Sequence, residues 1–405
     1  MPKKSKIYNF PVGNGDMTLI EIASNDKYFR ILCDMNIRES SNRQINGFDN
    51  SQCDVIARLH EIIETDENDR PYIDVLLLTH PDEDHIRGFS KYFHSGSPED
   101  YNAASNDDDY NKIFVREIWS SPIIFRRKQK NHSLCDDAKA MNKEAKRRVQ
   151  LYRNNGYIGI EGNRIRLIGE DTNGKTDDIL NIVYKRDDTI NTVNETYIQE
   201  LNVTVLAPLD DDDFPDDVSI DKNRSSIVMR WAISSHGRLI ATNHLLLGGD
   251  ADVHCWEILH DKYRFNTDAL EYDLLVAPHH VSWRTLSKDS YSESDDPQVC
   301  DKAKLALGHA KEGAVIIASS NKILNDDNDP PNYQAMKEYK SILSSVDGEF
   351  KSLATHKPNG KRYPEVLAYR LTSDGLQEEE GSDKSDSTKV AAGMAKVAAV
   401  QIPHG

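Results

Sequence analysis

The chain has 405 residues and a formal net charge of −17 at pH 7, from 50 lysines and arginines against 67 aspartates and glutamates. A charge this negative excludes a surface that is basic throughout, but it allows a local basic patch. No apolar run approaches the roughly 18 residues of a membrane span, and residues 1–7 lack the apolar stretch of a secretory signal. The five cysteines are scattered without a CxxC pair, so we expect a soluble, cytoplasmic globular protein without a disulfide framework.

The first third of the chain combines strand-like runs with two helical patterns. Gly13-Asn14-Gly15 favours a tight turn between the first two strands. Apolar side chains recur at helical spacing over residues 51–64, and residues 86–93 form a second predicted helix. The predicted strands here are residues 6–12, 17–22, 28–33 and 74–79, and the last is a short apolar run typical of a strand buried on both faces.

Strand signals continue through the rest of the chain. The further predicted strands are residues 113–119, 202–207, 226–231, 245–247, 274–277, 315–319 and 366–371. Strands in meanders with occasional helices indicate a layered α/β sandwich and not a regular βαβ repeat. We predict one domain over residues 1–375, with an insertion at about 95–200, followed by a low-complexity, flexible tail over residues 376–405.

Residues 126–153 reverse the charge of the chain, with ten lysines and arginines against three acidic residues. From Asp136 onward, apolar residues recur on one face of a predicted helix and leave the basic side chains largely on the other. Two interpretations stay open: an ordinary solvated helix face, or a surface that tracks phosphates beside an active site. Under the second interpretation, Arg147 and Arg148 contact the substrate.

The strongest chemical signal is Leu78-Thr79-His80-Pro81-Asp82-Glu83-Asp84-His85, at the end of a predicted buried strand. The chain turns sharply at a strand end, so side chains two to five positions apart converge on a small volume. Imidazoles and carboxylates together suit zinc, manganese or iron(II) better than calcium or magnesium alone. We therefore predict metal binding by four side chains, those of His80, Asp82, Asp84 and His85.

Two later strands also end in candidate ligands. The apolar run at residues 245–247 is followed by Gly248-Gly249-Asp250, and the run at 274–277 is followed by Pro278-His279-His280. A glycine turn or a histidine pair alone carries little information. Together with the first motif, they form the set that one metal centre at a sheet edge requires.

These motifs resemble the metallo-β-lactamase superfamily, and within it the hydrolase domain of ComEC-type competence proteins. The matching pieces are residues 12–16, 19–21, 32–34, 77–86, 223–228, 246–251 and 277–282, within a resemblance that spans roughly residues 6–371. Two departures stand out. No histidine in a matching context lies between the first motif and Asp250, and Val281 stands where the family usually has glycine.

The resemblance implies a four-layer αββα sandwich with one or two divalent metal ions, Zn²⁺ or Mn²⁺, at one edge of the sheets. It implies that His80 and Asp82 hold the first metal, that Asp84, His85 and one histidine of the 279–280 pair, taken as His279, hold the second, and that Asp250 bridges both. Asp16 supports the site. Asn14, Asp16 and Ser282 become candidate substrate contacts by their places in the family fold.

Such a centre predicts hydrolysis by a metal-activated hydroxide. Asp84 or Asp250 orients the hydroxide, and His280, where it is not itself a ligand, stabilises the transition state or protonates the leaving group. We expect a phosphodiesterase or nuclease whose partner is nucleic acid, in particular DNA. The alternatives are a hydrolase of small esters, lactones or thioesters, and a non-catalytic interaction module. The competence proteins' membrane channel is absent from this sequence, so DNA uptake and a membrane partner are not expected.

Overall fold

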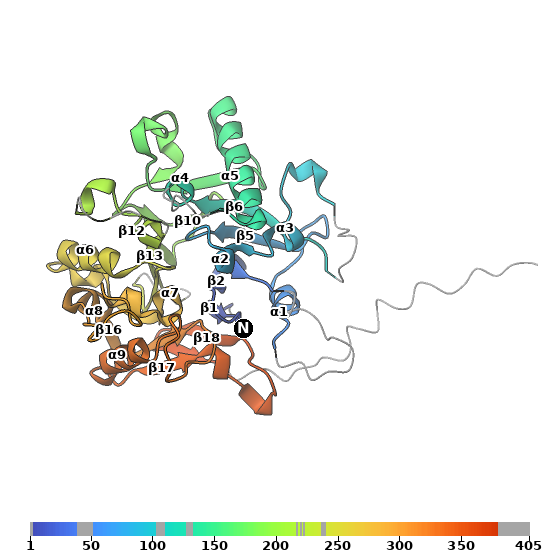
Figure 1. The fold of residues 1–405 in the computed structure, drawn as a ribbon. Helices are drawn as coiled ribbons and strands as arrows, with labels where there is room; N and C mark the ends of the chain where they lie inside the picture. Colours follow the sequence, from blue (N-terminus) through green and yellow to red (C-terminus); the bar gives the residue numbers. More distant parts are fainter. Residues whose placement is uncertain are drawn as a thin grey trace, which may run out of the picture.

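The computed structural model describes residues 3–38, 52–102, 110–126, 133–215, 218, 221, 223–235 and 240–379. Over these residues the chain is a mixed α/β protein built on two large sheets (Figure 1). The first sheet has the strand order β19-β18-β1-β2-β3-β5-β6-β7-β8, and the second has the order β17-β16-β15-β14-β13-β12-β9.

Nearly all of the first sheet comes from the first half of the chain. Its strands are β1 (Lys6–Asn9), β2 (Thr18–Ser24), β3 (Lys27–Cys33), β5 (Tyr72–Leu77), β6 (Phe114–Ser120), β7 (Arg164–Ile168), β8 (Val183–Tyr184), β18 (Leu367–Thr372) and β19 (Gly375–Glu378). Its neighbouring helices are α1 (Val55–Ile62), α2 (Glu83–Ile86), α3 (Phe89–Tyr92), α4 (Pro122–Arg126) and α5 (Asp136–Asn155). The short strand β4 (Met35–Asn36) lies beside α2.

The second sheet comes from the second half. Its strands are β9 (Thr189–Ile190), β12 (Leu201–Ala207), β13 (Val228–Ile233), β14 (Asn243–Leu247), β15 (Tyr272–Val276), β16 (Ala310–Ala318) and β17 (Glu349–Ser352). The helices of this half are α6 (Val253–Tyr263), α7 (Pro278–Val281), α8 (Asp301–Leu307) and α9 (Tyr333–Ser344). A separate hairpin joins β10 (Thr192–Val193) to β11 (Thr196–Tyr197).

The direction of the strands determines where the candidate ligands lie. In the first sheet β3, β5, β6, β7 and β8 run parallel, and in the second β14, β15, β16 and β17 do the same. Residues that follow neighbouring parallel strands meet at one edge of a sheet. The segments after β3 and β5 therefore lie side by side, as do those after β14 and β15.

The two sheets pack face to face around one apolar core. Trp119 of β6 stacks on Trp231 of β13 with ring centroids 6.1 Å apart. Leu245 and Leu247 of β14 point into this core, whereas Leu246 between them belongs to a second core shared with α6, α8 and α9, as the alternation of a strand requires. Figure 1 accordingly shows α6, α8 and α9 on one side of the strands and α1 and α3 on the other.

The sequence-based elements are largely confirmed. Each predicted strand overlaps a strand of the structure, and α1 and α5 occupy their predicted segments. The predicted helix over residues 86–93 is wrong in detail, because Gly88 has a φ of +97° and separates α2 from α3. Within the described residues, no helix combines the length and apolarity needed to cross a membrane.

Two predicted boundaries need correction. Residues 95–200 are not a simple insertion, because β6, β7 and β8 lie within them and extend the first sheet. The tail does not begin at residue 376, since β19 spans Gly375–Glu378 and pairs with β18. The rest of the predicted tail, from residue 380 onward, lies outside the described residues.

Candidate metal centre

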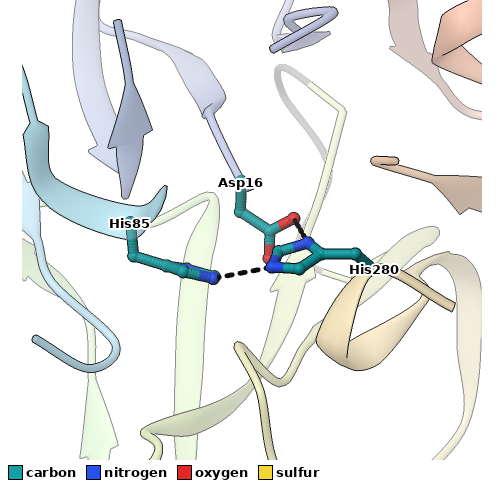
Figure 2. A group of neighbouring side chains, drawn as sticks. All are labelled: Asp16, His85 and His280. Carbon is teal, nitrogen blue, oxygen red and sulfur yellow. Dashed lines mark hydrogen bonds and ion pairs between the residues drawn. The ribbon is translucent and has the colours of Figure 1, made fainter. Parts of the chain in front are cut away.

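The structure brings the ends of four strands together at one site. Asp34 follows β3, the His80–His85 segment follows β5, Asp250 follows β14, and the His279–His280 pair follows β15. Asp16, just before β2, completes the group, and Figure 2 shows it facing His280, which in turn faces His85. Residues from both sheets therefore meet in one buried His/Asp cluster.

Asp250 lies at the centre of this cluster. Its Oδ2 is 3.3 Å from His80 Nε2 and 3.6 Å from His279 Nε2. Its Oδ1 is 3.0 Å from His85 Nε2 and 3.4 Å from His280 Nε2. The carboxylate thus presents one oxygen to each of two pairs of imidazoles, which is the arrangement of a bridging ligand.

Further acidic side chains stand on each side of Asp250. On the His85 side, Asp84 Oδ2 lies 3.4 Å from His280 Nε2, and Asp16 Oδ1 lies 3.5 Å from His280 Nδ1. On the other side, Asp82 Oδ2 lies 3.9 Å from His80 Nε2. Ligand atoms of His80, Asp82 and Asp250 all lie within 4.8 Å of one another, as do those of Asp16, His85 and His280.

All six metal ligands predicted from the sequence meet at this site. The two histidines of the 279–280 pair, however, lie with different groups of ligands from those predicted. His280, assigned a catalytic role if it was not itself a ligand, has its Nε2 3.1 Å from His85 Nε2, among the second group of ligands. His279 shares Asp250 Oδ2 with His80. It therefore supplies an imidazole on the first side, where the sequence offered no other histidine in a matching context.

Opposite charges shift the pKa values of the cluster strongly. Burial alone would raise the pKa of Asp250, but the surrounding histidines hold it well below its ordinary value. Burial would lower the pKa of His85, yet Asp250 and Asp34 raise it well above its ordinary value. Burial likewise opposes the charge of His280, and Asp250, Asp16 and Asp84 raise its pKa to about 10. The carboxylates thus create a strongly negative potential that favours a cation at this point.

The chemistry of the donors fits a divalent ion. His80 Nε2, Asp250 Oδ1 and Asp16 Oδ1 are buried and make no hydrogen bond of good geometry. Buried polar atoms without hydrogen bonds are costly and rare, so a group of them requires an explanation. Imidazole nitrogens and carboxylate oxygens are the ligands that zinc and manganese prefer. The described residues could hold a metal ion here, and Zn²⁺ or Mn²⁺ as its identity stays a prediction.

Asp34 is a positioning residue that the sequence analysis did not single out. Its Oδ1 accepts a hydrogen bond from the Thr79 backbone nitrogen at 2.7 Å, and its Oδ2 accepts one from Thr79 Oγ1 at 2.5 Å. The same Oδ2 lies 2.8 Å from His85 Nδ1. A carboxylate behind a ligating imidazole fixes its orientation and tautomer. The sequence signal that could have identified Asp34 is an acidic residue directly after a predicted strand, within the family-like segment 32–34.

We expect Asp34→Asn to weaken metal affinity by roughly 10- to 100-fold, because the amide cannot accept all of these hydrogen bonds. Competition with a chromogenic chelator would measure the change. Asp26→Asn is the matched control, since Asp26 is exposed in the turn between β2 and β3, and it should leave the affinity unchanged. Equal affinity in both variants would remove Asp34 from the site.

The backbone around the histidine pair is strained in a way that aims both rings at Asp250. His279, His280 and Val281 have φ values of 51°, 54° and 68°, a left-handed run that costs about 1–2 kcal/mol per residue. The His279 nitrogen donates to Gly249 O at 3.0 Å and ties β15 to β14. Gly249 is required there, because an added Cβ would lie 2.6 Å from Thr79 Oγ1.

The structure gives the predicted substrate contacts other partners. Asn14 donates to Pro330 O and accepts from the Asn321 nitrogen, so its amide holds a loop of the protein. Ser282 is 1% exposed and donates to Asp329 Oδ1 at 2.8 Å. Both side chains therefore have structural partners, and Asp16 belongs to the His/Asp cluster itself.

The prediction that Arg148 contacts the substrate is wrong, and the same prediction for Arg147 is weakened. Arg148 is 2% exposed, and its guanidinium donates to Glu144 and to backbone carbonyls of β6 and β7. Arg147 is half-buried and donates to Glu144, to Asn163 Oδ1 and to a backbone carbonyl. These arginines anchor α5 to the sheet, because a buried guanidinium must find acceptors in the protein.

Comparison with known proteins does not extend this description: no protein-family model matches the chain, and no curated protein matches it significantly. The class that the fold and the site define is a mixed α/β protein with a buried His/Asp cluster able to hold a metal ion. A more specific function has to be argued from the chemistry of the cluster and its surroundings.

Proposed function

We propose that the protein is a metal-dependent hydrolase of the metallo-β-lactamase type that cleaves phosphodiester bonds in DNA. The observation that carries the proposal is Asp250, whose two carboxylate oxygens each face a different pair of histidines. A bridging carboxylate between two sets of ligands is what a two-metal hydrolytic site needs. The packed sheets with helices on their outer sides support the αββα sandwich as the fold.

The proposed ligands fall into two groups that share Asp250. His80, Asp82 and His279 would hold one ion, and Asp84, His85 and His280 the other. Divalent ions bound at such a site lower the pKa of a water molecule and neutralise charge on the phosphate oxygens. The imidazole of His85 is held in place by Asp34, so its Nε2 is the ring nitrogen that faces the site.

Differences in exposure indicate the side from which a substrate approaches. The side chain of Asp84 is 35% exposed and that of His279 is 16% exposed, whereas those of His85 and His280 are at most 1% exposed. Asp84 is therefore the acidic group best placed to orient an attacking water. His280 is enclosed, and its Nδ1 lies 3.1 Å from the Ser319 carbonyl oxygen, to which it can donate while Nε2 faces the site, so we assign it a ligand role in place of proton transfer to a leaving group.

The choice of DNA rests on the exposed lysines of α5, which packs beside α2 and α3. Asp137 of α5 accepts hydrogen bonds from the Gly88 and Ser90 nitrogens, so the helix lies close to the segment that carries Asp84 and His85. Lys139, Lys143 and Lys146 remain exposed along it, and such a row attracts phosphates.

A second candidate is a hydrolase of small esters, lactones or thioesters. The observation that favours it is the inward placement of Arg148 and the internal partners of Arg147, which reduce the basic surface available to a polynucleotide. This alternative keeps the same ligands and predicts no salt-dependent affinity for DNA.

Elemental analysis of the purified protein, combined with a nuclease assay on linear and circular DNA, tests the proposal. We expect bound divalent metal and cleavage that requires added Mn²⁺ or Zn²⁺, with a chelated sample as the control. Cleavage of circular DNA would show endonuclease action. Hydrolysis of a chromogenic carboxylic ester but not of DNA would favour the second candidate, and protein that binds no metal would contradict both.

A further inference from the structure

A cavity of about 690 Å³ lies between α5, α4, β7 and the 3₁₀ helix Asp177–Ile182. Its volume falls in the roughly 300–1,000 Å³ range of small-molecule sites. Phe125, Leu134, Val149, Leu167 and Ile179 give it apolar walls. None of the proposed metal ligands lines it, and we call it the α5 cavity.

The rim of the α5 cavity is cationic. Among the described residues, Arg126, Lys146, Arg153 and Lys175 line it, and Asp171 is the one acidic residue in the lining. Asp171 is already paired with Arg126, and Arg153 is paired with Asp178 outside the lining. Within the described residues, Lys146 and Lys175 make no ion pair, so two positive charges at the rim are available to an anion.

The floor of the cavity contains a buried hydroxyl without a partner. Ser120 is 2% exposed, lines the cavity, and its Oγ makes no hydrogen bond within the described part of the chain. Ser120 ends β6, whose Trp119 carbonyl accepts a hydrogen bond from the Leu78 nitrogen just before the His80 segment. The cavity thus opens at the same edge of the first sheet as the metal centre, where ligands of α/β proteins bind.

We propose that the α5 cavity binds a nucleoside phosphate. Lys146 and Lys175 contact the phosphate, the apolar walls with Phe125 enclose the base and sugar, and Ser120 Oγ hydrogen-bonds a polar atom of that part. A pocket that combines apolar walls, a cationic edge and neutral polar side chains such as Ser121, Asn142 and Gln150 suits an anion that carries a partly apolar body with polar atoms of its own. The nucleoside phosphate is either a free nucleotide or the 5′-phosphorylated end of a polynucleotide.

Titration calorimetry on the purified protein tests this site with thymidine 5′-monophosphate, which contains no phosphodiester bond to cleave. We expect saturable binding that Lys146→Glu weakens on the order of tenfold, because it converts a contact to phosphate into a repulsion. Lys340→Glu is the matched control, with the same charge change at an exposed helical position, in α9, outside both the cavity lining and the lysine row of α5. Ser120→Ala should weaken binding several-fold through the lost hydroxyl.

Absence of binding at millimolar nucleotide, or equal loss in Lys146→Glu and Lys340→Glu, would overturn the proposal. Inorganic phosphate that binds as tightly as the nucleotide would also overturn it, since the apolar walls would then contribute nothing. A 5′-phosphorylated oligothymidylate with phosphorothioate linkages distinguishes the two sources: tighter binding than the mononucleotide assigns the cavity to a polynucleotide end, and weaker binding assigns it to free nucleotides.

The result of the nucleotide-binding test can be distinguished from the result of the test of the proposed hydrolase function. Nucleotide binding by a parent protein that shows no metal-dependent cleavage would contradict the hydrolase and support the cavity, and this binding should also survive Asp250→Ala. Metal-dependent cleavage without nucleotide binding would support the hydrolase and contradict the proposed cavity site.

Discussion

Asp250→Ala is expected to lower metal-dependent hydrolysis on the order of 10³-fold or more, because it removes the carboxylate that joins the two groups of ligands. Four imidazole nitrogens lie within 3.0–3.6 Å of its two oxygens, and no other side chain in the described structure has that position. Metal content, measured by elemental analysis, should fall together with the rate.

Folding has to be separated from chemistry in this test. The far-ultraviolet circular dichroism of Asp250→Ala should match that of the parent, because the side chain ends a strand and contributes little apolar packing. Asp268→Ala serves as the control, since Asp268 is exposed in a loop of the same half of the chain. An Asp250→Ala protein that is folded, metal-loaded and fully active would mean that the centre lies elsewhere.

The largest effect on stability is expected for Arg148→Met, a loss of about 3–5 kcal/mol in the free energy of unfolding. Arg148 and Glu144 are 2% and 3% exposed and form an ion pair at 2.8 Å. The substitution also strands the carbonyls of Val115 and Arg164, which accept from the guanidinium at 3.1 and 3.0 Å. Urea unfolding followed by circular dichroism would measure the change.

Lys143→Met is the matched control for this prediction. It makes the same kind of substitution at an exposed site on α5, where the free energy of unfolding should change by less than about 0.5 kcal/mol. If Arg148→Met proved as stable as Lys143→Met, the guanidinium would have to lie on the surface. A substrate contact at Arg148 would then return as an explanation.

The positions of the ligands were predictable because they follow apolar strands. The runs at residues 74–79, 245–247 and 274–277 each end in histidine or aspartate, and parallel strands bring such ends to one edge. The division of roles between His279 and His280 was not predictable in this way. It depends on a left-handed backbone that continues through Val281, where a β-branched residue gives no hint of a positive φ.

The orientation of α5 is a second feature that could not be predicted fully from the sequence. Its apolar stripe was identified from five residues. Ala138, Met141 and Ala145 are buried as predicted, and Val149 and Tyr152 are partly buried against the same core. Arg148 lies seven residues after Met141 and so belongs to the same stripe, but a charged residue was assigned to the solvent face. Only the buried Glu144 and the free carbonyls of the sheet make its inward position favourable, and these are tertiary contacts.

The arrangement of the first sheet also bears on how the protein is made. β1 lies between β2 and β18, with Lys6 opposite Arg370, so β1 pairs with a strand that is synthesised long after it. Until β18 arrives, the nascent chain exposes the backbone edge of β1, and open edges of this kind pair with other chains. Synthesis of β18 is therefore the event that closes this edge.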